Sequence, residues 1–152
     1  MTRLLLFLGP QPRWLRFDRG RIAAQGEGLP APMADAELVV AVPAEAVALH
    51  WLALPDLAPA QAQAAARLLA ADLTAAPVDR LHVAVAPGGG RRPVALVAMD
   101  VMAGWLAELA AAGLVPDRMV PDALLLAAPA EGVAVLQVGA RWLVPVSYTH
   151  LT

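Results

Sequence analysis

The sequence has no cysteine and no lysine, and its single serine lies close to the C-terminus. Without cysteine, the chain has no disulfide bonds, no thiol nucleophile and no cysteine ligands for a metal ion. With only that one serine, a Ser-His-Asp triad is not available either. The three histidines, His50, His82 and His150, stand at no spacing that suits a shared metal ion. We therefore expect no catalytic residue, no metal and no other cofactor.

Charge and long hydrophobic runs are also scarce. Only 16% of the residues are charged, the formal net charge is −2, and all eleven basic residues are arginine. The arginines are too sparse for a nucleic-acid patch, so we expect no nucleic acid partner and a solvated Arg91–Arg92 turn. No stretch approaches the roughly 18 apolar residues of a membrane span, and residues 4–8 are better explained as a buried strand than as a signal peptide. We expect the chain itself to be soluble.

What the sequence does contain is apolar residues, which make up 59% of its 152 positions. That share excludes a disordered chain, because enough apolar surface is available to offset the entropy lost on folding. The length allows one ordinary domain or two small ones.

Strand patterns dominate the first third of the chain. A strand at 3–8 with an apolar run from residue 4, an alternating run at 14–18 and a third strand at 21–25 are separated by turns that contain glycine, which predicts an antiparallel meander. Residues 38–42 are apolar at every position, as in a strand inside a sheet that helices cover.

Helices and strands alternate after that point. We expect strands at 47–54, 81–86 and 94–99. A helix from Pro59 to Leu73 should bury Leu68, Leu69 and Leu73, and a second, 101–112, should bury Met102, Trp105, Leu106 and Leu109. Asp100 should cap the second helix and Gly113 should end it, while Asp122 should cap a short helical turn and Asp117–Arg118 should form a surface pair.

The chain closes on a hairpin that resembles its first one. Residues 4–8 precede Arg13-Trp14-Leu15, and residues 133–138 precede Arg141-Trp142-Leu143. A repeat of this kind suggests a duplicated fold. It resembles the RNase H/actin-like superfamily, an α/β fold with a mixed sheet and flanking helices, in which each of two related domains begins with a β-meander. Nucleotide-binding and nuclease members of that superfamily hold phosphate or metal with carboxylates of the first hairpin or strand. Neither hairpin here contains Asp or Glu.

A more specific resemblance begins at Val40. The segments VPAEAVALHWLALP, LLAADL and DRLHVA, then Trp105-Leu106 with GLVP and VPDALLL, resemble the cytoplasmic domain of the type II secretion system protein L family (GspL-type proteins). The following hairpin agrees as well. Together these segments cover most of residues 40–143. They are structural motifs and name no active site.

This resemblance implies a non-catalytic scaffold at the cytoplasmic face of the bacterial inner membrane. The scaffold would recruit the E-type secretion ATPase and contact M-type platform proteins, and a second copy of the chain is a further candidate partner. The membrane would be reached only through a span that is not in this chain. Under this reading, residues 1–128 form a first actin-like subdomain and 129–146 open a second, truncated one. Residues 147–152 resemble a non-native tail.

Arginine and tryptophan are common anchors at protein interfaces, so Arg13, Trp14 and Arg16 are the candidate partner-binding residues.

Two alternative functions, from classes other than a scaffold, can be compared with the sequence. A nucleotide-binding actin-like protein of the pilus-assembly (PilM) type would need an Asp in the first hairpin. A nuclease of the RNase H type would need a carboxylate on the first strand, and its absence argues strongly against that reading.

Overall fold

The computed structural model describes residues 1–126, 135–138 and 140–143. Two compact units divide the chain. The first comprises Met1–Ala44 with Leu109–Thr152, and the second comprises Glu45–Glu108. The second unit is therefore inserted into the first. The predicted boundaries at 128 and 146 lie outside the described residues and stay a prediction.

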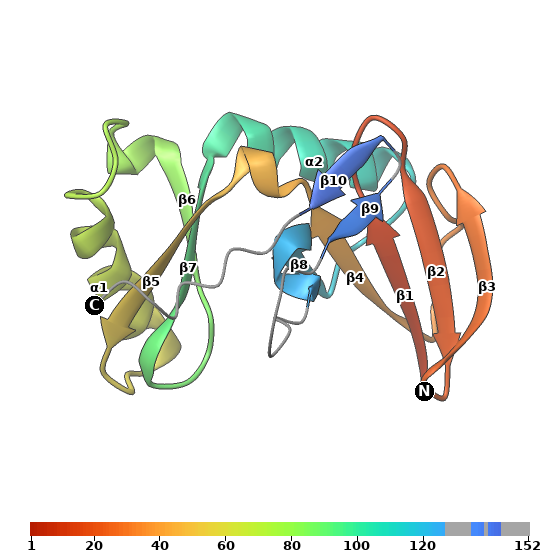
Figure 1. The fold of residues 1–152 in the computed structure, drawn as a ribbon, viewed down its shortest axis with the longest axis horizontal. Coiled ribbons are helices and arrows are strands. Elements are labelled where there is room, and N and C mark those ends of the chain that lie inside the picture. The colour runs from red at the N-terminus through yellow and green to blue at the C-terminus, as the bar shows by residue number, and fades with distance from the viewer. Residues whose placement is uncertain (127–134, 139, 144–152) are drawn as a thin grey trace. The chain divides into compact units, whose positions relative to one another are not determined.

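The first unit is built on a five-stranded mixed sheet (Figure 1). The predicted meander is confirmed, because the first three strands along the chain pair antiparallel. β4 then lies parallel to β1 and to β8, so this apolar strand is interior as expected. The sheet order is β3-β2-β1-β4-β8, with the strands β1 Thr2–Phe7, β2 Arg13–Asp18, β3 Arg21–Glu27, β4 Ala36–Val42 and β8 Arg118–Pro121.

The register assigns side chains to the two faces of this sheet, since residues paired across strands point the same way. Leu4 pairs with Leu38, and Leu6 pairs with Val40, and all four side chains are buried. Leu114, which follows helix α2 (Met99–Ala111), is also buried and approaches Leu4 and Leu38. This face therefore carries the core of the first unit.

The second unit has a three-stranded antiparallel sheet of order β5-β7-β6, with one helix against it. Its elements are β5 Ala48–Leu54, helix α1 Pro59–Ala70, β6 Leu81–Val85 and β7 Gly90–Ala98, and short 3₁₀ turns occur at Ala44–Ala46 and Val78–Arg80. Each of the strands predicted at 47–54, 81–86 and 94–99 is present. Figure 1 shows β7 between its two partners.

Helix α1 turns a different face to the sheet from the one we expected. The helix ends at Ala70, and its buried residues are Ala62, Ala66 and Ala70. Leu68 is 77% exposed, and Leu69 and Leu73 are also exposed. The predicted leucine stripe is wrong because α1 packs closely on the sheet, where only a methyl side chain fits at every fourth position.

Helix α2 is also more exposed than its sequence predicts. Leu109 is buried, but Leu106 is exposed and Met102 and Trp105 are only half-buried. The helix begins at Met99, so Asp100 lies in its first turn and is not the N-cap; its Oδ1 accepts a hydrogen bond from the next amide. Gly113 ends the helix as predicted, with a φ of 71° that favours glycine.

Arg92 is buried, so the prediction of a solvated Arg91–Arg92 turn is wrong for this residue. Its guanidinium donates hydrogen bonds to the carbonyl oxygens of Pro55, Ala86 and Gly88. A buried arginine is tolerated here because backbone carbonyls accept hydrogen bonds from both of its terminal nitrogens. It ties the glycine-rich turn to the end of β5.

The last described elements are strands β9 Leu136–Val138 and β10 Arg141–Leu143, which pair antiparallel as predicted. The remaining parts of the expected hairpin, 133–134 and 144–146, lie outside the described residues. No helix in the described part of the chain is long and apolar enough to cross a membrane.

Candidate functional site

The structure does not bring the three predicted partner-binding residues together on one surface. All three lie on β2, but Trp14 pairs with Leu6 and Arg16 pairs with Leu4, which places both on the buried face of the sheet. Arg13 pairs with Phe7 and points to the opposite face. A single flat partner cannot cover all three side chains.

Trp14 is held in place by a neighbouring strand. Its indole lies directly against Gly26 of β3, where an added Cβ would come within 2.7 Å of two ring carbons. Gly26 is therefore required by packing, and Trp14 is half-buried. The position of Trp14 indicates a structural role in fixing β3 onto β2.

The two arginines differ in how firmly they are paired. Arg16 Nε lies 3.4 Å from an Asp18 carboxylate oxygen, and both side chains are only partly exposed. Arg13 Nη2 lies 3.3 Å from Glu27 Oε1, with the Arg13 side chain 52% exposed and the Glu27 side chain 82% exposed. An exposed pair of this kind contributes little to stability, so Arg13 can exchange Glu27 for a partner's carboxylate at small cost.

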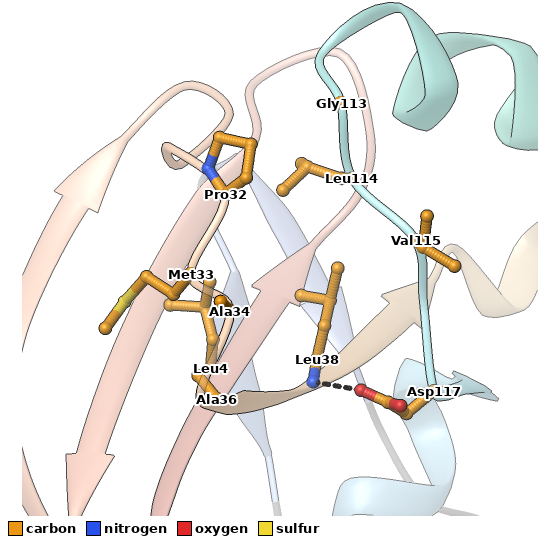
Figure 2. A pocket seen from close by; sticks show the side chains of 10 residues that line it. All are labelled: Leu4, Pro32, Met33, Ala34, Ala36, Leu38, Gly113, Leu114, Val115 and Asp117. Atoms are coloured by element: carbon orange, nitrogen blue, oxygen red, sulfur yellow. Dashed lines mark hydrogen bonds between the residues drawn. The ribbon is translucent and has the colours of Figure 1, made fainter.

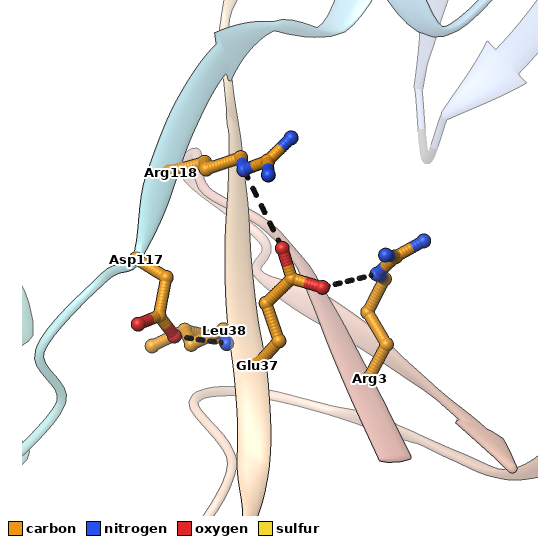
Figure 3. Close-up of polar contacts among 5 residues, drawn as sticks. All are labelled: Arg3, Glu37, Leu38, Asp117 and Arg118. Carbon is orange, nitrogen blue, oxygen red and sulfur yellow. Dashed lines mark hydrogen bonds and ion pairs between the residues drawn. The ribbon is translucent and has the colours of Figure 1, made fainter. Parts of the chain in front are cut away.

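A second charged cluster lies on the same face as Arg13. Glu37 of the interior strand β4 is bracketed by an arginine from each neighbouring strand, Arg3 at 2.8 Å and Arg118 at 3.4 Å (Figure 3). Its side chain is 13% exposed, whereas both arginine side chains remain more than half exposed. The cluster leaves one net positive charge on this part of the surface.

The expected Asp117–Arg118 surface pair is wrong. Arg118 points to Glu37, and Asp117 Oδ2 accepts a hydrogen bond from the Leu38 amide at 2.7 Å. The Asp117 amide also donates to the Leu38 carbonyl at 2.9 Å. These two bonds join β8 to β4 at the point where their pairing begins.

A shallow pocket of about 480 Å³ opens beside this joint. Figure 2 shows Pro32 and Leu114 facing each other across it, with Leu38 and Asp117 at its far end. Its lining is mostly apolar, and Val115 at the rim is 83% exposed. The pocket carries no cluster of polar groups that would orient a small substrate.

Asp122 is the one carboxylate among the described residues that is fully buried, with 2% exposure. Its Oδ1 accepts a hydrogen bond from the Ala44 amide at 3.0 Å, and its Oδ2 lies 3.1 Å from Arg141 Nη1. It makes no side-chain cap on the short turn that it begins, so the predicted capping role is wrong. It instead joins the end of β4 to the second hairpin.

The sequence around Asp122 does not indicate that it joins β4 to the second hairpin. Asp122 follows a proline and precedes an apolar run, which is also the pattern of a helix cap. Its partner amide and its partner arginine both lie far from it along the chain, at positions 44 and 141. Only the tertiary fold identifies such contacts.

The described part of the chain has no cluster of three or more His, Cys, Asp or Glu side chains that would hold a metal ion. The turn of the first hairpin and the described strands of the second present no carboxylate, and Asp122 has both oxygens occupied by protein donors. The fold defines an α/β domain with the organisation of actin-like proteins.

Comparison with solved structures supports this class. The cytoplasmic domain of EpsL, an inner membrane component of the type II secretion system of Vibrio cholerae, matches with a TM-score of 0.71 and 24% identity. The match covers 95% of this chain and 67% of that one. The PilM–PilN type IV pilus biogenesis complex matches with a TM-score of 0.56 and 19% identity, over 79% of this chain and 46% of that one. The predicted actin-like α/β fold is confirmed.

Sequence comparison identifies the family. The family model of the type II secretion system protein L matches residues 18–151. A protein of that name from Pectobacterium carotovorum subsp. carotovorum is 34% identical over 105 residues. The chain belongs to the type II secretion system protein L family, as its motifs indicated. The aligned part covers 68% of the chain but only 25% of that relative's length.

Proposed function

We propose that this chain is a non-catalytic scaffold that recruits the secretion ATPase to the cytoplasmic face of the inner membrane. Family membership supports a role in type II secretion. The observation that carries the non-catalytic part of the proposal is the state of Asp122. Its two carboxylate oxygens are bonded to the Ala44 amide and the Arg141 guanidinium, so among the residues that the structure describes no fully buried carboxylate is left for a cation.

Arg13 is the residue that we propose to contact the ATPase. It is the most exposed of the three candidates, and its pairing with the exposed Glu27 is easily broken. Arg3 and Arg118 on the same face extend the positive surface. This surface suits a partner with an acidic contact patch, because complementary charge raises the association rate and selects the partner. Trp14 and Arg16 would support the strand from its other face.

We expect that Arg13→Glu weakens binding of the secretion ATPase at least tenfold, since it places a negative charge against an acidic patch. Arg21→Glu makes the same charge change on the neighbouring strand, where Arg21 is exposed, and is the matched control. Calorimetric titration of the purified ATPase into each variant measures the effect, and thermal melting checks folding.

Loss of binding in both variants would indicate a general charge effect and not a contact at Arg13. Unchanged binding in Arg13→Glu, with binding lost in a Val115→Asp variant at the rim of the shallow pocket, would assign the ATPase to the pocket. No binding by the unmodified chain would refute recruitment by this region.

The runner-up is a nucleotide-binding protein like the pilus-assembly members of the fold. The similarity to the PilM–PilN complex supports the fold alone at 19% identity. The contacts of Asp122 argue against nucleotide binding, because both of its carboxylate oxygens are already bonded within the protein.

A further inference from the structure

The five-stranded sheet of the first unit is apolar on both faces, but only one face is fully buried in the described part of the chain. The buried face carries the core of the unit. On the opposite face the large apolar side chains keep contact with water: Leu5, Phe7, Leu15, Phe17 and Val39 are half-buried, and Ile22 is 59% exposed. We call this second surface the open face. Strands that are apolar on both sides are typical of a sheet with a covering layer on each face.

The strand register arranges the six side chains of the open face in a diagonal band. Residues that face each other on neighbouring strands form rows across the sheet. Along successive rows, the band runs through Ile22 and Phe17, then Leu15, Leu5 and Val39, and then Phe7. Ala41, beside Phe7, is buried, so the open band ends there. The band crosses β3, β2, β1 and β4, which is about 14 Å at the usual strand spacing.

Arginines flank the band on both sides. Arg13 lies beside Phe7 on one flank, and on the other flank Arg3 lies beside Phe17 and Arg118 lies beside Val39. Figure 3 shows Arg3 and Arg118 on either side of Glu37. The three arginine side chains are all more than half exposed. Three arginines and their two glutamate partners, Glu27 and Glu37, leave one net positive charge around the band.

An amphipathic helix has the dimensions and chemistry that this surface requires. A helix of about ten residues is about 15 Å long, which matches the length of the band. Its apolar stripe, with residues three and four apart, can lie along the band. Acidic side chains on both sides of that stripe then reach the arginines on both flanks. Because arginines flank the band on two sides, they favour a helix with acidic residues on both edges of its stripe.

We propose that the open face binds an amphipathic helix of the secretion ATPase, with the apolar stripe of that helix along the band and its acidic side chains against the flanking arginines. This inference rests on the proposed function, which places the ATPase at Arg13. It adds that apolar contact carries the binding, and that the contacting segment of the ATPase is a helix with acidic flanks. Arg13 then selects the partner at the edge of an apolar contact, as is common at protein interfaces.

Replacing Ile22 with aspartate tests the apolar contact. Because Ile22 is an exposed residue, the change should not unfold the sheet. We expect Ile22→Asp to weaken ATPase binding at least tenfold, since the carboxylate would lose its water in an apolar contact and face acidic side chains. Leu68→Asp makes the same change at an exposed position on α1 and should leave binding unchanged. Calorimetric titration with the purified ATPase measures the affinities, and thermal melting checks folding.

The absence of cysteine allows a direct measurement of which surface the ATPase covers. In an Ile22→Cys variant the thiol is unique. A saturating concentration of ATPase should slow its alkylation at least tenfold, whereas a Leu68→Cys thiol should react at the same rate with and without the ATPase. A photo-crosslinker attached to the Ile22→Cys thiol should join to one ATPase segment, with apolar residues at helical spacing and acidic residues on both sides of them.

Weakened binding of Arg13→Glu with unchanged binding of Ile22→Asp would leave ATPase recruitment standing and overturn the helix contact. A crosslink to a segment without helical spacing would overturn the helix contact as well. If the Ile22→Cys thiol reacted slowly without the ATPase, the chain itself or a second copy would already cover the open face, and this inference would be wrong. If the unmodified chain bound no ATPase, both the recruitment and the helix contact would fall.

Discussion

Replacing Asp122 with alanine should lower the free energy of unfolding by about 2 to 4 kcal/mol, the largest effect that we expect from one substitution. The change leaves the Ala44 amide without its side-chain acceptor and removes one partner of Arg141, whose side chain is 25% exposed. Because that arginine side chain is partly exposed to water, the cost should fall below that of breaking a fully buried ion pair. Urea denaturation followed by circular dichroism measures it.

Asp122→Asn separates the two contacts. The amide oxygen of asparagine still accepts a hydrogen bond from Ala44, but the charge opposite Arg141 is lost. We expect an intermediate loss of stability. If both variants melted like the unmodified chain, the joint between β4 and the second hairpin would not be a stabilising contact.

Replacing Ala66 with leucine should destabilise the second unit by about 1 to 3 kcal/mol, because a larger side chain does not fit between α1 and the sheet. Ala66 has no exposed surface and packs in a cluster with Leu54, Val83 and Val94. Thermal melting and hydrogen exchange of β5 and β6 measure the effect.

Leu68→Ala is the matched control for this prediction. Leu68 is 77% exposed, so its truncation should change stability by less than about 0.5 kcal/mol. The opposite outcome, a tolerated Ala66→Leu and a costly Leu68→Ala, would restore the leucine face to the core.

The strand order along the chain was largely predictable. The first two strands of the meander show an apolar run and an alternating pattern, and the apolar residues 38–42 predict an interior position for β4. These patterns are local, because the order of apolar and polar residues within one strand indicates which of its faces are buried. The missing carboxylates in the hairpins were also readable directly, because the relevant positions follow from the strand pattern.

The buried face of α1 was not predictable in this way. Leucine is usually the core residue of a helix, but the helix lies so close to its sheet that alanines occupy the contact. The distance between a helix and a sheet is set by both elements, and the helix sequence alone does not record it. The same limit applies to α2. This helix has more apolar residues than the described part of the chain buries.

Long-range polar pairs were missed for a related reason. Glu37 is bracketed by Arg3 and Arg118, and Asp117 bonds to Leu38, only because β1, β4 and β8 lie side by side. The adjacent pair Asp117 and Arg118 looked like partners in sequence. Side chains of successive residues in an extended chain point in opposite directions. Asp117 and Arg118 therefore do not pair with each other, and each contacts a residue of β4 instead.

A calorimetric titration of Mg-ATP into the chain tests most directly the claim that this actin-like domain is a scaffold without nucleotide chemistry. We expect no saturable binding up to millimolar nucleotide, because Asp122 is bonded to Ala44 and Arg141 and neither hairpin turn has a carboxylate. Saturable binding with micromolar affinity, lost on Asp122→Asn, would contradict it.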